Sequence, residues 1–136
     1  MRKIEFRGKR SGDNVWVYGS LLVYPDGDAD ICCFEGANCV KHITIDPNTV
    51  GQCTGMKDKN DEDIYEGDIL EHKFGGIGIV KFNQHWGSFC YSHLTGRDEY
   101  GKIVKMIGSK SFYSDSYTYK IVGNIYDSRE LVEASK

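Results

Sequence analysis

Apolar and polar residues alternate along several short stretches of this chain, which is the pattern of half-buried β-strands. Residues 15–24 are rich in β-branched and aromatic side chains, and they end at Pro25 and Gly27, which suit a tight turn. Residues 31–34 read as a returning strand, and residues 39–45 alternate clearly. Together these segments predict an N-terminal hairpin region over about residues 1–47.

A second β-rich region extends from about residue 48 to residue 125. Its predicted strands are residues 50–56, 64–70, 77–82, 88–92 and 117–122. Gly78 inside a strand predicts a bulge or a bend, which a small barrel needs in order to close. Residues 95–116 are interpreted as a loop with one short element near residues 102–107. The number and spacing of the strands favour an SH3-like small barrel.

The C-terminal segment carries the start signal of a helix. Asp127 followed by Glu130 fits a capping pattern, and apolar residues come directly after it. This pattern predicts a short helix over about residues 127–135. The chain is therefore expected to be mostly β with minor α, as a single domain over residues 1–136.

The composition of the 136 residues is that of an ordinary globular protein. Apolar runs are far shorter than the roughly 18 residues of a membrane span. No secretory signal follows Met1, so we expect a cytoplasmic protein without a membrane anchor. Five cysteines without an export signal are expected to be reduced thiols.

Charge is distributed unevenly along a chain whose net charge is −3. Residues 1–10 carry five basic side chains against one acidic, a net charge of +4. Residues 57–68 carry two basic against six acidic side chains, a net charge of −4. The basic set is the one part of the chain suited to phosphate contact, and it consists of Arg2, Lys3, Arg7, Lys9 and Arg10.

Several segments of the chain resemble the YopX family of phages and prophages. The longest is residues 49–70, TVGQCTGMKDKNDEDIYEGDIL, and the second is residues 119–126, YKIVGNIY. A weaker likeness lies in residues 4–9, IEFRGK, with residues 16–19, WVYG. The resemblance implies a phage or prophage context, and it brings no catalytic residues or cofactors with it.

The chain departs from the family pattern at Asn60-Asp61, where the family usually has Asn-Gly. Residues 57–63 are too polar to bury and are expected to form an exposed tip between two strands. A non-glycine residue at positive φ costs roughly 1–2 kcal/mol, so we expect a strained tip or a longer loop. Asp68 after Gly67 is interpreted as a turn residue at the entrance of a strand.

Cysteine and histidine residues raise two chemical hypotheses. Cys90 and His93 have the spacing of a zinc ligand pair, but no second pair accompanies them, so we expect no metal and buried structural cysteines. Cys90 with His93 or His85 could form a nucleophile–base pair, which requires a geometry that sequence does not give. The acidic tip could hold a cation, although a solvated surface is the simpler interpretation.

Gly67-Asp68 and the following Gly75-Gly76 are similar to the Gly-Asp strand and glycine-rich loop of KOW-type SH3-like barrels, some of which bind RNA. That likeness, with the basic N-terminus, gives the alternative hypothesis of a nucleic-acid-binding module. A hydrolase or metal-dependent nuclease is the third hypothesis. Fold alone does not separate these classes.

The favoured hypothesis is a non-enzymatic accessory protein, without cofactor, that binds a host or phage protein or forms a homo-oligomer. Trp86 lies in a predicted turn, where a large aromatic side chain suits an interface as well as the core, and the strand face of Tyr117 and Tyr119 is expected to be core or subunit contact. The residues expected to take part in binding are His85, Trp86, Tyr65, Tyr117 and Tyr119.

Overall fold

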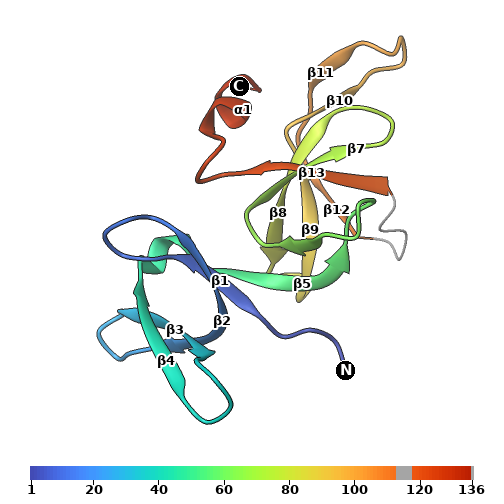
Figure 1. Cartoon of the computed structure of the whole chain (residues 1–136). Helices are drawn as coiled ribbons and strands as arrows, with labels where there is room; N and C mark the ends of the chain where they lie inside the picture. The colour runs from blue at the N-terminus through green and yellow to red at the C-terminus, as the bar shows by residue number, and fades with distance from the viewer. Residues whose placement is uncertain (113–117, 136) are drawn as a thin grey trace. The chain divides into compact units, whose positions relative to one another are not determined.

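The computed structural model describes residues 1–112 and 118–135 and is mostly β with one short helix (Figure 1). The chain divides into two compact units, Met1–Gly55 and Met56–Lys136. The mostly-β prediction is confirmed. The strand orders describe open sheets, so a closed SH3-like barrel is not confirmed. The single domain, with its expected internal boundary near residue 48, stays a prediction.

The first unit is an antiparallel sheet in the order β4-β3-β2-β1-β5. Its strands are β1 (Phe6–Lys9), β2 (Trp16–Val23), β3 (Ala29–Phe34), β4 (Val40–Ile45) and the first five residues of β5 (Gly51–Lys57), with a 3₁₀ turn η1 (Pro47–Thr49) before β5. The predicted N-terminal strands are confirmed in β2, β3 and β4. Sequence patterns did not reveal β1, which lies in the centre of the sheet between β2 and β5.

One face of this sheet forms the core of the first unit. Ala29, Ile31 and Ile45 are buried, and they pack with partly buried residues, namely Phe6, Val17, Leu21 and Val50. The end of β4 also meets the end of β1, because Arg10 and Ile45 form an antiparallel bridge. The backbone N–H of Ser11 donates to the C=O of Thr44 at 3.0 Å. The last residues of β4 are therefore bonded on both sides.

The second unit contains a five-stranded antiparallel sheet in the order β12-β9-β8-β7-β13 (Figure 1). Its strands are β7 (Asp68–His72), β8 (Ile77–Asn83), β9 (Ser88–His93), β12 (Ser109–Ser111) and β13 (Tyr119–Asn124). A separate hairpin joins β10 (Thr95–Arg97) to β11 (Ile103–Lys105), and β6 (Asp63–Tyr65) follows β5 in strand order. The helix α1 (Arg129–Glu133) comes last.

Four details of the sequence prediction are wrong. The expected loop over residues 95–116 had one short element near residues 102–107, which is β11, but it also contains the strands β10 and β12. The predicted strand over residues 64–70 is divided by a turn at Gly67. Register runs through Gly78 without a shift, and the bulge lies instead between Ile121 and Gly123 of β13. The helix is present, but its N-cap is Ser128, which makes no side-chain capping bond.

Gly78 is required for close packing and not for a bulge. A Cβ atom built at this position would lie 2.5 Å from the ring of Tyr91 and 2.6 Å from the carbonyl oxygen of Ser92. The core beside it contains Ile64, Leu70, Val80, Tyr91 and Tyr119, with Met56, Phe112 and Ile121 packed around them. The missing side chain at Gly78 thus makes room for an aromatic ring in the core.

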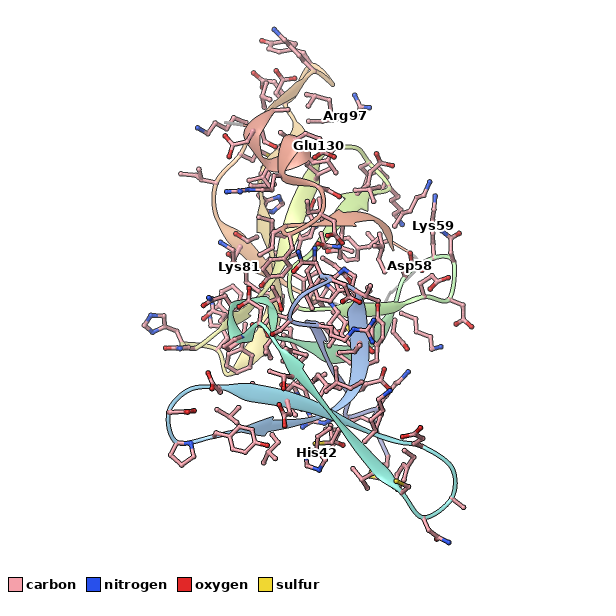
Figure 2. All side chains as sticks on the ribbon, turned by 60° about the vertical axis from the view of Figure 1, so that its left-hand side comes forward. His42, Asp58, Lys59, Lys81, Arg97 and Glu130 are labelled. Carbon is pink, nitrogen blue, oxygen red and sulfur yellow. The ribbon has the colours of Figure 1, made fainter. Side chains whose placement is uncertain are left out.

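The acidic tip between β5 and β6 is built around a buried carboxylate. Asp58 is 2% exposed, which corrects the expectation that this whole segment is solvated. Its Oδ1 accepts from the backbone N–H groups of Asn60 and Glu62, each at 2.9 Å, and its Oδ2 accepts from Ile121 at 3.0 Å. The neighbouring Lys59 N–H donates to the C=O of Tyr119 at 2.9 Å (Figure 2 labels Asp58 and Lys59). One side chain thus shapes the turn and joins it to β13.

Asp61 has φ of +64°, which confirms the strained tip expected from the Asn60-Asp61 departure.

Among the described residues, no helix is long and apolar enough to cross a membrane.

Candidate functional site

The predicted binding residues His85 and Trp86 lie in the turn between β8 and β9. The Oδ1 of Asn83 accepts from the backbone N–H of His85 at 2.9 Å and from that of Trp86 at 3.1 Å. Trp86 is half exposed, and at the same end of the hairpin Phe82 packs edge-on against Phe89 with ring centroids 5.4 Å apart. This hairpin end therefore presents aromatic surface, and its binding role stays a prediction.

Tyr65 and Tyr119, predicted to bind a partner, are both buried. The ring of Tyr119 lies 5.1 Å from that of Tyr91 and 5.5 Å from that of Phe112, inside the core of the second unit. These positions explain both tyrosines as packing residues, and a role in binding remains untested. Tyr117 lies outside the described residues.

The basic N-terminal residues are largely engaged in contacts of their own unit. The guanidinium of Arg7 is buried and lies 4.6 Å from the ring centroid of Trp16, and the ammonium of Lys9 lies 5.4 Å from it. Arg10 donates to Asp13 at 3.0 Å, which raises the pKa of Arg10 and lowers that of Asp13. Arg2 and Lys3 are exposed. Much of the positive charge expected to meet phosphates is thus used within the sheet.

The segments that resemble the YopX family form paired strands in the structure. Arg7 pairs with Tyr18 and Lys9 with Trp16, so the two weakly similar segments form the β1–β2 ladder. β13 pairs with β7, which joins the two stronger segments. The Oδ2 of Asp68 accepts from the N–H of Tyr65 at 2.7 Å, as expected for a turn residue. The family pattern in this chain therefore reports hydrogen-bonded turns and strand pairing.

All five cysteines are free thiols, and Cys53 and Cys90 are buried. In residues 1–112 and 118–135, no group of three or more His, Cys, Asp or Glu side chains could hold a metal ion. Cys90 and His93 are three residues apart on β9, so their side chains point to opposite faces of the sheet. That pair therefore does not form the zinc pair or the nucleophile–base pair considered from the sequence.

A different cysteine–histidine contact occurs in the first unit, where Cys32 Sγ lies 3.6 Å from His42 Nδ1 (Figure 2 labels His42). The same Nδ1 lies 3.6 Å from Asp30 Oδ2, which also accepts from the Tyr24 hydroxyl at 2.7 Å. Burial and the charge of Asp30 raise the pKa of the Cys32 thiol. A nucleophilic cysteine requires the opposite shift, so this group is a polar contact within the sheet.

The residues around this polar contact leave apolar side chains exposed on the first unit. Leu22 pairs with Asp30, and Phe34 pairs with Val40, which places these residues on the sheet face opposite to the core residue Ile31. Phe34 is 77% exposed and Val40 is 50% exposed. The exposed apolar residues on this face are Tyr18, Leu22, Phe34 and Val40. We call the surface that they form the outer face.

Sequence reasoning did not identify the outer face. The available signal was that residues 16–23 are apolar at both odd and even positions, although an antiparallel strand with one solvated face usually alternates. Apolar residues on both faces are typical of a strand that is covered on both faces. No such layer covers Phe34 or Val40 in the described part of the chain.

β4 is also an edge strand, because β3 alone neighbours it in strand order. The N–H of Glu35 donates to the C=O of Cys39, so the alternation of an antiparallel ladder directs the backbone groups of Val40, His42 and Thr44 away from β3. The C=O of Thr44 accepts from Ser11, in agreement with this direction. Val40 and His42 therefore offer backbone donors and acceptors at an open edge next to the outer face.

Two histidines of the second unit lie beside its buried tyrosines. The His72 ring contacts Tyr119 edge-on at 5.5 Å, and the His93 ring contacts Tyr91 edge-on at 5.0 Å. Burial and nearby positive charge lower the pKa of both histidines below the ordinary value of 6.5. His72 Nδ1 also accepts the Phe74 N–H at 3.1 Å, a bond that protonation of this atom removes. Both rings are thus built to be neutral.

We expect the free energy of unfolding to fall as the pH drops below about 6.5, because the unfolded chain then binds protons that the folded histidines resist. Above that pH both states are neutral and this contribution to stability is fully present. Urea unfolding between about pH 7.5 and pH 5 measures the slope. The double variant His72→Gln/His93→Gln should flatten it. An unchanged slope in the double variant would contradict the assignment.

Comparison with known protein families gives a match over nearly the whole chain. The model of a family described as YopX protein matches residues 5–133, which include strands of both units. No curated protein matches the chain.

Proposed function

Because this chain belongs to the YopX family, we propose that it is a cytoplasmic phage or prophage accessory protein that acts by binding and not by catalysis. Its partner is a second copy of the same chain, which pairs along β4. The observation that carries this proposal is the open edge of β4 beside the exposed outer face.

The edge suits pairing between identical copies because a strand can pair antiparallel with its own symmetry mate. The two-fold axis of such a dimer brings each strand against itself in the opposite direction. Val40 and His42 supply the outward backbone groups for this ladder, and Thr44 is partly used by Ser11. The outer faces of the two copies then form one continuous apolar surface that includes Phe34 and Val40.

Lys41 restricts the register of the pair. A ladder centred on Lys41 would place two ammonium groups opposite each other, which is unfavourable. A ladder centred on His42 instead places Lys41 opposite Ile43 and bonds the two His42 backbones to each other. The second register is the one proposed.

Size-exclusion chromatography with light scattering over a range of concentrations tests the dimer. His42→Pro removes an outward N–H while keeping the bonds to β3, and proline is tolerated at strand edges. We expect this variant and Phe34→Glu each to weaken dimerisation by at least about tenfold, a loss of about 1.4 kcal/mol. Tyr100→Glu, an exposed aromatic residue of the second unit, is the matched control and should dimerise normally. A wild-type protein that stays monomeric at high concentration would overturn the proposal.

The fold proposal is an SH3-like small barrel in the second unit. Its support is the meander β7-β8-β9-β12 followed by the return of β13 to the side of β7. The bulge between Ile121 and Gly123 adds the local bending that closure of a small sheet requires. Backbone NMR contacts that close the sheet between its outer strands test this proposal.

A further inference from the structure

Four cationic or protonatable side chains lie against aromatic rings at one end of the second unit's sheet. Lys110 pairs with Tyr91 in the β12–β9 ladder, and its ammonium lies 5.4 Å from the Tyr91 ring and 5.7 Å from the Tyr119 ring. His72 and His93 flank the same two tyrosines. Lys73 follows His72 and lies over the Phe74 ring at 5.1 Å. We call Lys73, His72, His93 and Lys110 the cationic cluster.

The register places His72, His93 and Lys110 on one face of the sheet. Tyr119 pairs with His72, and His93 pairs with Gly78, beside which the ring of Tyr91 lies. Lys110, His72 and His93 are all partly buried and partly open to solvent. They therefore come from three strands and converge where the core reaches the surface.

No carboxylate balances this charge within residues 1–112 and 118–135. Lys110 makes no ion pair there, and burial lowers its pKa. The charge of Glu71 contributes to the raised pKa of Tyr91. The two neighbours of Glu71 on β7 lie on the face of the cationic cluster, so the Glu71 side chain points to the opposite face of the sheet. The electrostatic influences on His72 come from Lys110, Lys73 and His93, and all of them oppose its protonation. A partly desolvated positive group without a counter-ion is the setting that an anion stabilises.

We propose that the cationic cluster binds a small oxyanion of the phosphate type between Lys110 and the two histidines. Ammonium and imidazolium groups both donate to phosphate oxygens, and such charge-assisted bonds are stronger than neutral ones. The buried tyrosine rings form the floor of the site and restrict water around the anion.

Binding at this site is linked to pH. An anion favours the protonated histidines, so it raises the pKa of His72 and of His93, and by reciprocity lower pH strengthens anion binding. Each unit by which either pKa rises corresponds to about tenfold tighter binding at low pH. The site is therefore weak when both histidines are neutral and becomes strong as they gain protons.

The test is a titration followed by the NMR signals of the two histidine rings. Sulfate is the first probe because it keeps its charge across the pH range, so that any pH dependence comes from the protein. We expect the His72 and His93 signals to shift saturably with sulfate, more tightly at about pH 5.5 than at about pH 7.5, with chloride at equal ionic strength as the baseline. Phosphate and a 5′-mononucleotide follow as second and third probes and separate a free anion from a phosphate ester.

Three lysine variants make the test specific. Lys110→Gln should weaken sulfate binding at least about fivefold, and Lys110→Arg should retain binding because it keeps the charge. Lys120→Gln makes the same change on β13 at an exposed position and should bind like the wild type. Absence of saturable shifts with all three probes would overturn the proposal, and so would equal binding by the Lys110→Gln variant. Circular dichroism of each variant verifies that the fold is intact.

Discussion

Replacement of Asp58 by alanine is expected to lower the free energy of unfolding by about 3–4 kcal/mol, since a hydrogen bond to a charged group contributes about 1.5–3 kcal/mol and such losses do not add fully. The substitution leaves the N–H groups of Asn60, Glu62 and Ile121 without their acceptor. It therefore disrupts both the β5–β6 connection and its attachment to β13. Urea unfolding of the full chain, followed by circular dichroism, measures the loss.

Two variants at the same turn calibrate this prediction. Asp58→Asn keeps one acceptor oxygen and should lie between the wild type and alanine. Asp61→Gly removes a non-glycine residue at φ of +64° and should raise stability by about 0.5–1 kcal/mol, since it relieves the left-handed strain. If Asp58→Ala cost less than about 1 kcal/mol, a typical surface change, Asp58 would not be the centre of this turn.

Gly76→Ala is expected to cost about 3–4 kcal/mol through overpacking and backbone strain together. A Cβ at this position would lie 2.4 Å from the carbonyl oxygen of Thr95 and 2.6 Å from the Cα of Gly96, and neither backbone atom can rotate away. The glycine also has φ of +87°. The β7–β8 turn must then separate from β10, where Arg97 Nε donates to the C=O of Phe74 at 2.8 Å (Figure 2 labels Arg97).

Gly101→Ala is the matched control for this prediction. Gly101 has φ of +79°, but no atom lies within 4 Å of the place that a Cβ would take there. Its substitution should cost about 1 kcal/mol, the strain of positive φ alone. The difference between the two variants in thermal or urea unfolding isolates the close approach of the strands. Equal losses would show that the backbone angle, and not the contact with Thr95, makes glycine necessary at position 76.

Strands with clear alternation could be predicted from the sequence: β4 lies where the pattern placed it, and β13 begins two residues later than predicted. β2 was predicted from its β-branched and aromatic residues. β1 was missed because Arg7 and Lys9 give it the composition of a surface segment. In the structure, both cations lie over the ring of Trp16. β10, β11 and β12 are three residues each, too short for periodicity to reveal. Their positions depend on pairing partners distant in the chain.

The candidate site was less predictable than the fold. Composition correctly marked the β5–β6 tip as acidic, but it could not distinguish a solvated carboxylate from Asp58, whose partners are backbone groups up to 63 residues away. Trp86 was correctly placed in a turn. The edge of β4 and the cationic cluster arise from strand order and register, which bring Lys110 beside Tyr91 and leave Val40 at an edge. Neither property is local in sequence.

Strand order also sets when each unit can form during synthesis on the ribosome. The first unit spans residues 1–55, so β1 can complete its pairing with β5 while most of the chain is still unmade. In the second unit, one edge of β7 stays unpaired until β13 has been synthesised, about 50 residues later. For much of its translation, the growing chain therefore has a fully paired first sheet and a β7 strand with one unpaired edge. Ribosome-stalled chains ending before and after β13 would differ in protease resistance at β7.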